Sequence, residues 1–381
     1  MSDDAQLKHR VCDQTVEVLA RHLGACTPEF PGRRFVREAT RGLDGLELKA
    51  RVTHIADVLA GCLPAAFPKA AALIQGVTEL QPEADPSPFF VYWPVATFVE
   101  RHGVDHFEEA FATMHGLTRL ASCEFAIRPF LTREPERSFT LLERWVDDVD
   151  PHVRRLVSEG TRPRLPWGPR LRALQADPSP SVALLDRLFT DEELYVRRSV
   201  ANHLNDISKD HPDLAVATAR RWSEVEHSRP DDVAWVVRHA LRTLVKKGHA
   251  GALALQGFGP AEAELVSFDV HPKTLTFGEP LQLALEVKAL GEGNWMLDYV
   301  VHRVLANGRL ARKVFKWTRR EVRAGERVVL DKEHPIRAIS TRKYYDGLHR
   351  CEVLINGRSL AIRDFTLTGA QAERSARSDR R

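Results

Sequence analysis

The chain has few cysteines and little net charge. Its 381 residues include five cysteines, and these lie far apart at positions 12, 26, 62, 123 and 351. No two form the Cys-x-x-Cys pair of a zinc clip or a redox disulfide, so we expect reduced thiols in an intracellular chain. Basic residues number 55 and acidic residues 52, for a formal net charge of +3. A globally basic nucleic-acid binder is thereby excluded, and any contact with a polyanion must come from local patches.

Long apolar runs and metal-binding patterns are also missing. The N-terminus is charged from Asp3 onward, and no window approaches the roughly 20 apolar residues that a membrane span needs. His203, His211 and His239 form no H-x-x-x-H pair of the kind that holds zinc. We therefore expect a soluble, cytoplasmic monomer with no membrane partner, no metal and no cofactor.

The first two thirds of the chain carry helical periodicity. Apolar residues recur at helical spacing over residues 7–23, 46–63 and 69–81, with a further helix near 95–102 and another over 107–125. Prolines, including the cluster PEADPSP at 82–88, separate these segments. The last of these helices is expected to deliver Glu124 and Arg128 near its end, one turn apart.

A repeat appears in the middle of the chain. The strings PHVRRLVSEG, LYVRRSVANHL and AWVVRHALRTL align on Val153, Val196 and Val236, which are 43 and 40 residues apart. This spacing is typical of HEAT-like repeats, in which pairs of helices stack into a solenoid. Acidic turns precede each string and favour the start of a helix. We predict an all-α HEAT-like catalytic domain over residues 1–257.

Beyond Gln256 the pattern changes to two-residue alternation. Seven short runs are divided by Asn-Gly, Gly-Glu and Asp-Gly pairs, at 265–270, 281–290, 296–305, 310–317, 327–330, 348–355 and 359–367. Seven strands in about 105 residues predict an all-β immunoglobulin-like sandwich over residues 262–369. His349 stands where the corner before the F strand of such folds usually has a tyrosine. The polar, basic tail at 370–381 is expected to be disordered.

The stretch from 148 to 172 is the most unusual in composition. Between 151 and 172, six arginines oppose the single acid Glu159, a local net charge of +5 that indicates a polyanionic partner. Glu159 repels such a partner, so its presence favours a chemical role, and Trp167 is the one indole there. A plainer interpretation is open for each: Glu159 with Arg155, and Glu124 with Arg128, have the four-residue spacing of solvated helix ion pairs, and Trp167 could plug a loop over the core.

Three strings resemble a known family. They are CEFAIRPFL from residue 123, RRLVSEGTRPRLPWG from 154 and DPSPSVALLDRLFTDEELYVRRSVANHLNDISKDHP from 177. They resemble the AlkC and AlkD type of bacterial DNA glycosylases, and AlkC most closely. The resemblance implies HEAT-like repeats, removal of alkylated bases in base excision repair and, in some AlkC members, a C-terminal immunoglobulin-like domain. It also implies an active site made of Glu124, Glu159, Trp167 and Asp206.

The chemistry of alkylated bases fits these residue types. A 3-methyladenine or 3-methylcytosine in DNA is already cationic, so it leaves as a neutral molecule without a general acid. The sugar then acquires oxocarbenium-like charge, which a carboxylate can stabilise while it orients water. An indole face also attracts a cation. The expected enzyme is a glycosylase that acts on duplex DNA without a deep base-flipping pocket.

Basic residues are expected to hold the duplex. The predicted DNA contacts are Arg128, Arg154, Arg155, Arg162, Arg164, Arg170, Arg238, Lys246, Lys247, Arg312, Lys316 and Arg320. The last three lie in the run 303–323, where eight basic residues face one acid for a net charge of +7. Strand alternation would put Arg312, Lys316, Thr318 and Arg320 on one face, so the sandwich is interpreted as a DNA clamp. An ordinary solvated sheet face is the plainer alternative.

Two other classes of function are open. A HEAT-like scaffold could bind DNA or an acidic protein without chemistry, but such a scaffold has no need of Glu159 among arginines. A hydrolase could flip its base into a pocket, but the Gly-rich helix-hairpin-helix string before a catalytic aspartate is not found. Both are less favoured than the glycosylase.

Overall fold

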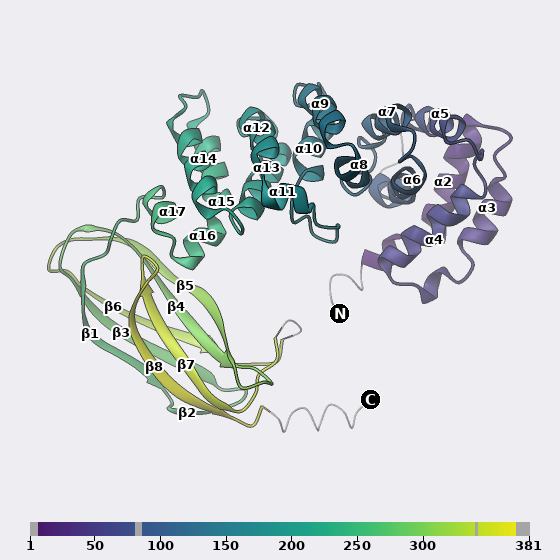
Figure 1. Ribbon diagram of the computed structural model, residues 1–381. Helices are drawn as coiled ribbons and strands as arrows, with labels where there is room; N and C mark the ends of the chain where they lie inside the picture. Colours follow the sequence, from purple (N-terminus) through teal and green to yellow (C-terminus); the bar gives the residue numbers. More distant parts are fainter. Residues whose placement is uncertain (1–6, 81–85, 340–341, 371–381) are drawn as a thin grey trace. The chain divides into compact units, whose positions relative to one another are not determined.

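The computed structural model describes residues 7–80, 86–339 and 342–370. The predicted disordered tail from 371 and most of the proline cluster at 82–88 lie outside the described residues. Contacts divide the chain into two compact units, Met1–Ala240 and Leu241–Arg381. The first is helical and the second is mostly β-sheet (Figure 1). The domain boundary at residue 257 stays a prediction.

The helical unit is a run of short helices in chain order. Its elements are η1 (Lys8–Arg10), α2 (Asp13–Cys26), α3 (Gly32–Ala39), η2 (Leu43–Gly45), α4 (Leu48–Ala60), α5 (Phe67–Thr78), α6 (Pro88–His102), α7 (Phe107–Leu117), α8 (Arg128–Arg133), α9 (Pro135–Trp145), α10 (Pro151–Gly160), α11 (Arg172–Ala176), α12 (Ser179–Leu188), α13 (Leu194–Ile207), α14 (Pro212–Glu224) and α15 (Pro230–Ala240). Among the described residues, no helix is both long and apolar enough to cross a membrane.

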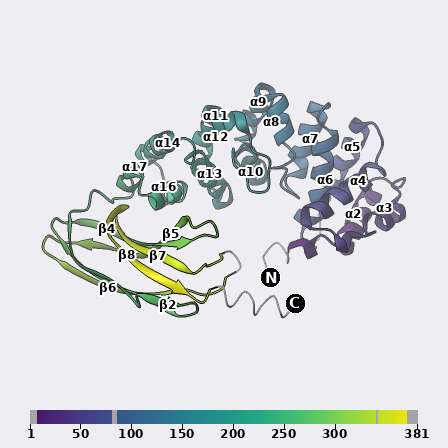
Figure 2. The ribbon, with the colours of Figure 1, turned by 60° about the horizontal axis from the view of Figure 1, so that its bottom comes forward.

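The predicted HEAT-like repeat is confirmed. Helices α10, α13 and α15 pack side by side (Figure 1). Helices α12 and α14, which lie between them in the chain, pack against their chain neighbours (Figure 2). The aligned valines Val153, Val196 and Val236 are each 0% exposed at the same place in successive repeats. Each repeat therefore buries its apolar stripe against its neighbours in the chain, as a solenoid requires.

The helix predicted over 107–125 is shorter than expected. Helix α7 ends at Leu117, and turns lead to α8. Glu124 therefore lies in a turn and not on a helix. Apolar spacing continues past the end because Ala121 and Ile127 are still buried, at 2% and 0% exposure. The apolar spacing therefore indicated which residues are buried and not where the helix ends. After the helix, the Cys123 amide donates a hydrogen bond to the Thr118 hydroxyl at 3.5 Å.

The second unit is an immunoglobulin-like sandwich preceded by two short helices, α16 (Arg242–Lys247) and α17 (Ala250–Ala254). One sheet has the order β1-β3-β6 and the other β2-β8-β7-β4-β5. The strands are β1 (Ala263–His271), β2 (Thr274–Thr276), β3 (Pro280–Ala289), β4 (Gly293–Val304), β5 (Leu310–Val322), β6 (Arg327–Pro335), β7 (Gly347–Ile355) and β8 (Arg358–Thr368). The seven predicted strands are confirmed, and the short β2, which pairs with β8 in parallel, was missed.

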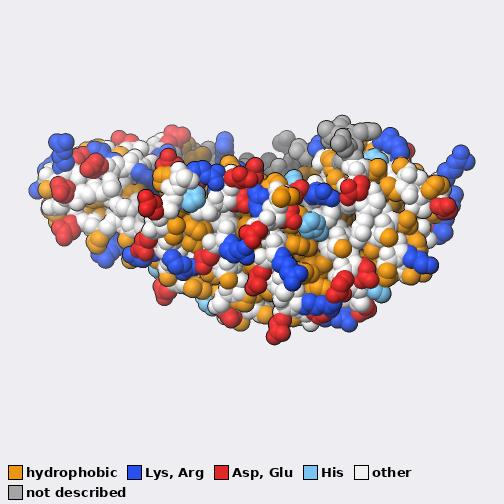
Figure 3. Space-filling model, turned by 90° about the horizontal axis from the view of Figure 1, so that it is seen from above, with side chains coloured by type: hydrophobic (Ala, Val, Ile, Leu, Met, Phe, Trp, Pro, Cys, Tyr) orange, Lys and Arg blue, Asp and Glu red, His pale blue; other side chains and the backbone are white. Residues whose placement is uncertain are grey.

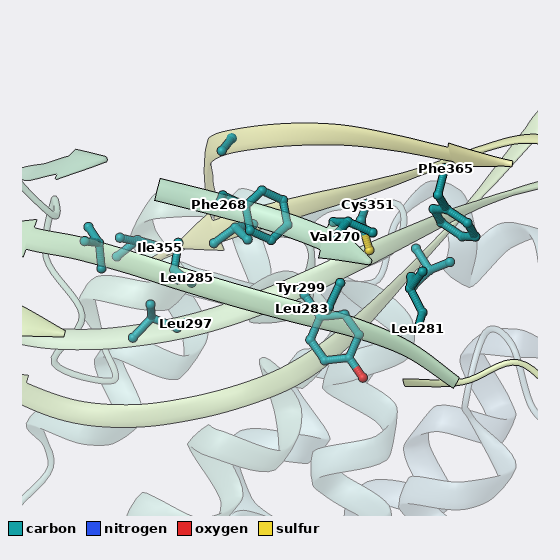
Figure 4. Packing of buried hydrophobic residues seen from close by; sticks show 14 of the residues in the cluster. Phe268, Val270, Leu281, Leu283, Leu285, Leu297, Tyr299, Cys351, Ile355 and Phe365 are labelled. Atoms are coloured by element: carbon teal, nitrogen blue, oxygen red, sulfur yellow. The ribbon is translucent and has the colours of Figure 1, made fainter. Parts of the chain in front are cut away.

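Alternating side chains of both sheets fill the core of the sandwich. Leu281, Leu283 and Leu285 of β3 project inward at two-residue spacing toward the opposite sheet (Figure 4). His349 takes the corner role that the sequence indicated, since its Nε2 lies 2.9 Å from the carbonyl oxygen of Tyr345.

Candidate functional site

Three carboxylates and two arginines form a row in which the charges alternate. Arg162 donates through Nη1 to Glu159 Oε1 at 2.6 Å and through Nε to Asp206 Oδ2 at 2.8 Å. Arg155 lies on the other side of Glu159, with Nη2 at 3.7 Å from Oε1, and donates to Glu124 Oε2 at 3.0 Å. The order of the row is Asp206, Arg162, Glu159, Arg155, Glu124. We call these five residues the charge row.

Most of the charge row is buried. Asp206 is 2% exposed, Glu159 6% and Arg162 7%. Burial by itself lowers the pKa of Arg162, but the carboxylates of Glu159 and Asp206 outweigh it, so the pKa is raised. The same balance, with Glu159 and Glu124, raises the pKa of Arg155. A solvated surface ion pair is therefore excluded for Glu159, and Glu124 pairs with Arg155 and not with Arg128.

Local sequence explains how α10 presents Glu159. Asp150 caps the helix by accepting a hydrogen bond from the His152 amide at 2.8 Å, and Pro151 occupies the first turn. Gly160 ends the helix where a Cβ atom would lie 2.6 Å from Ile127 Cγ2. Because no side chain separates the two backbones there, the turn that carries Glu124 can approach α10.

A polar network behind the row fixes the other oxygen of Glu159. Ser199 donates to Glu159 Oε2 at 2.6 Å and lies 2.9 Å from Ser158 Oγ. His203 Nδ1 is 2.9 Å from the carbonyl oxygen of Ser158. Burial, together with the charge of Arg162, lowers the pKa of His203 to about 3. His203 is therefore neutral at physiological pH and adds no charge behind the row.

Trp167 stands on the turn that follows Arg162 of the charge row in the chain. Its φ of 62° is in the left-handed region, and its indole is 52% exposed. About half of its surface is therefore open to solvent. The Lys49 ammonium donates to the Trp167 carbonyl oxygen.

Arg128 secures the base of the same turn. It is 1% exposed and donates to the carbonyl oxygens of Gly160, Arg162 and Pro169, each at 2.9 Å. Burial, with the nearby charge of Arg162, lowers the pKa of Arg128 to about 10. The expected DNA contact does not fit Arg128, because its donors are occupied inside the protein; it positions the turn.

Arg154 has an equally internal role. It is 8% exposed and donates to both carboxylate oxygens of Asp191, at 2.6 and 3.0 Å. Arg197, at the same place in the next repeat, donates to Asp232 at 2.8 Å. Arg154 of α10 thus binds an acid just before α13, and Arg197 of α13 binds an acid at the start of α15. The expected DNA contact therefore does not fit Arg154, whose guanidinium is bound to Asp191. It does not fit Arg162 either, because Arg162 is buried between Glu159 and Asp206.

The local charge of +5 is largely neutralised in space. Acids distant in sequence pair with these arginines, including Asp210, which accepts two hydrogen bonds from Arg164 at 2.6 and 2.7 Å. Basic and acidic side chains are interspersed over the face seen in Figure 3. Arg170 and Arg238, in contrast, are exposed. DNA contact by these two residues stays a prediction.

Arg198 is a site candidate that the sequence analysis missed. The repeat alignment places Arg155, Arg198 and Arg238 at the same position of α10, α13 and α15. The last two are exposed, and the three helices pack in that order. The alignment of the VRR strings contained this signal. It also placed Ser199 where the preceding repeat has Leu156, which marks a polar group at a core position.

A β-bulge changes which basic residues share a face in the sandwich. Asp298 of β4 pairs with Lys316, whereas the preceding residue, Leu297, pairs with Thr318, so Trp317 is the extra residue. Arg312 and Lys316 therefore share a face with Arg319. The predicted set is wrong for Thr318 and Arg320, which lie on the face of the core residue Leu297. Lys246 and Lys247 are exposed at the end of α16.

No part of the chain that the structure describes groups three His, Cys, Asp or Glu side chains in a way that could hold a metal ion. The elements that are present define a class: a HEAT-like solenoid whose repeats present carboxylates and an exposed indole, followed by an immunoglobulin-like sandwich.

Comparison with known proteins narrows this class. A family model described as the C-terminal Ig-like domain of the uncharacterised protein YhaZ matches residues 264–369. The uncharacterised protein YhaZ of Bacillus subtilis (strain 168) is 35% identical over 369 residues, covering 95% of this chain and 99% of that protein. A solved structure of Pseudomonas fluorescens alkylpurine DNA glycosylase AlkC, bound to DNA containing an abasic site analog, has a TM-score of 0.85 and 35% identity over 95% of this chain and 99% of that one. The chain belongs to the AlkC family.

Proposed function

We propose that the protein is a DNA glycosylase that hydrolyses the N-glycosidic bond of cationic N-alkylated bases, of the 3-methyladenine and 3-methylcytosine class, in duplex DNA. The observation that carries this proposal is the charge row, together with the exposed indole of Trp167 on the turn that follows Arg162 in the chain. The similarity to an alkylpurine DNA glycosylase over nearly the whole chain supports it.

In this proposal the lesion supplies the leaving group and the protein stabilises the sugar. A cationic base departs as a neutral molecule, so no side chain has to protonate it. Positive charge develops on the deoxyribose, and the carboxylates of Glu124, Glu159 and Asp206 stabilise it while one of them orients the attacking water. The exposed indole of Trp167 meets the same charge with its π-face.

The arginines of the row keep these carboxylates in place. Without Arg155 and Arg162, the carboxylates of Glu159 and Asp206 would be buried with much of their charge unpaired, which favours protonation or local unfolding. With the arginines present, the row holds three negative and two positive charges. Lys209, which is exposed, adds a third positive charge, because its ammonium donates to Asp206 Oδ1 at 2.8 Å. The carboxylates would therefore act on a cationic transition state through their positions and not through a net negative charge of the cluster.

DNA contact in this proposal comes from exposed basic residues. Arg198 joins the predicted Arg170 and Arg238 on the helical unit, and Lys246 and Lys247 lie at the end of α16. In the sandwich, Arg312 and Lys316 share one face of β5, together with Arg319. Each phosphate that such a residue neutralises releases counterions, so binding should weaken steeply with salt.

A base-release assay tests the function. Duplexes that carry 3-methyladenine, 3-methylcytosine, uracil or 8-oxoguanine are incubated with the full-length protein, and the free bases are separated and counted. We expect release of the two methylated bases and none of the neutral lesions at any enzyme concentration. Efficient release of uracil would contradict the mechanism, because a neutral base needs acid assistance. Binding of duplex without release of any base would instead favour the non-catalytic scaffold.

A further inference from the structure

A cavity beside Trp167 has no role in the mechanism above. Its volume is about 230 Å³, and its walls come from α4, from α6 and from the turns that carry Phe125 and Trp167. All of these elements belong to the helical unit. Pockets for drug-sized ligands measure roughly 300–1,000 Å³. This cavity therefore suits one small heterocycle and not a nucleotide.

The walls of the cavity are aromatic. Trp93, which is 4% exposed, stacks on Phe125 with ring centroids 5.9 Å apart and planes inclined by 21°. The Trp167 indole contributes another wall. Lys49 closes one edge, since its ammonium lies 5.3 Å from the Phe125 ring centroid and donates to the Trp167 carbonyl oxygen. Aromatic faces of this kind favour a flat ring.

Glu100 of α6 supplies an acceptor in this cavity. It is half-buried, and within the described residues no hydrogen bond or ion pair reaches its carboxylate. Burial raises the pKa of Glu100, while the charges of Lys49 and Arg101 act in the opposite direction. A carboxylate in such a place binds N–H donors well, because a charged acceptor makes the stronger hydrogen bond.

A phosphate group fits this cavity poorly. Glu100 would repel it, and the two cations at the rim already have partners: Lys49 has the carbonyl of Trp167, and Arg101 has the carboxylate of Asp57. A flat molecule with amino N–H groups, in contrast, would match both the walls and the acceptor. 3-Methyladenine and 3-methylcytosine both have a flat ring and an exocyclic amino group.

We propose that this cavity binds the free alkylated nucleobase after its release, with the ring against Trp93, Phe125 and Trp167 and the exocyclic amine donating to Glu100. The source of the base rests on the proposed function. Trp167, which the proposed mechanism places at the sugar, also lines this cavity, so the cavity adjoins the position from which the base would depart. The enzyme would then be inhibited by its own product.

Calorimetric titration of the full-length protein with free 3-methyladenine tests this site. We expect one site per chain, and we expect Glu100→Gln to weaken the affinity by about tenfold, since a neutral acceptor replaces a charged one. Thr97→Leu, which fills part of the cavity and keeps the Glu100 carboxylate, should weaken the affinity as well. Glu136→Gln, at an exposed position on α9, is the matched control and should bind as the parent does.

Three outcomes would overturn the proposal: no binding by the parent, equal affinity in the parent and both cavity variants, or displacement of the base by inorganic phosphate. Circular dichroism of each variant separates a lost site from a lost fold. The duplex release assay is independent of the titration. A parent that releases bases but binds none in free form refutes only the cavity, whereas a parent that binds the free base through Glu100 but releases none refutes only the proposed glycosylase.

Discussion

Replacing Glu159 by Gln removes one charge from the middle of the charge row and keeps the shape of the side chain. Arg162 retains Asp206 at 2.8 Å, and Arg155 retains Glu124 at 3.0 Å, so neither arginine is left alone. Ser199 can still bond to the amide. The expected loss of folding stability is therefore about 1–3 kcal/mol, below the ~3–5 kcal/mol of a buried pair that loses one partner outright.

The effect of Glu159→Gln on catalysis should be larger than its effect on binding. Losing one electrostatic stabiliser costs about 2–4 kcal/mol of barrier, so single-turnover release of 3-methyladenine should slow by roughly 30-fold to 1,000-fold. Duplex affinity, measured by fluorescence anisotropy, should change little because Glu159 is buried. Glu136→Gln on α9 controls for the loss of a charge elsewhere. If the Glu159 variant releases the base at the parent rate, Glu159 does not stabilise the transition state.

Three further predictions concern the turn, the sandwich and the buried network. Lys49→Met removes the donor to the turn carbonyl of Trp167, so release should slow by about tenfold while unfolding in urea changes by less than about 1.5 kcal/mol; equal release rates would contradict the positioning role. Arg312→Ala with Lys316→Ala should lower the log–log salt slope of duplex binding by about 1.8, whereas Arg320→Ala, on the opposite face, should leave it near the parent value; equal changes in both proteins would argue against the face that β5 defines. The third prediction uses the His203 pKa of about 3, which lies below its ordinary 6.5. Between pH 6.5 and about pH 3, His203 binds a proton in the unfolded chain but not in the native chain. Its contribution to the free energy of unfolding is therefore full above pH 6.5 and declines by about 1.4 kcal/mol per pH unit as the pH falls toward 3. Urea unfolding of the parent and of His203→Gln at pH 7, 6 and 5 should show the smaller decline in the variant, and parallel declines would refute the assignment.

The repeat and the strands could be predicted because they depend on short-range patterns. Val153, Val196 and Val236 recur at near-constant spacing because each fills the same core position, and the strands of the sandwich alternate because one side of each sheet is buried. The matched strings placed Glu124, Glu159, Trp167 and Asp206 in one family site, and the structure brings the three acids into a single row. Their catalytic roles stay predictions.

The errors arose where partners are distant in sequence. The stretch from 148 to 172 looked strongly basic because Asp191, Asp206 and Asp210, which neutralise its arginines, lie outside it. Arg128 and Arg154 were taken for phosphate ligands because sequence does not report burial. The prediction of which β5 residues share a face was wrong beyond residue 317, because one extra residue, Trp317, exchanges the two faces of the strand after it.

The charge row crosses the joint between two repeats, since Glu159 belongs to α10 and Asp206 to α13. No single repeat contains the site, and the spacing of its charges depends on the angle at which one repeat meets the next. The bonds from Arg154 to Asp191 and from Arg197 to Asp232 lie at consecutive joints of this kind. These ion pairs hold successive repeats together. A change in the angle between two repeats would also change the distances between the carboxylates. The electrostatic field at the site therefore depends on the curvature of the solenoid.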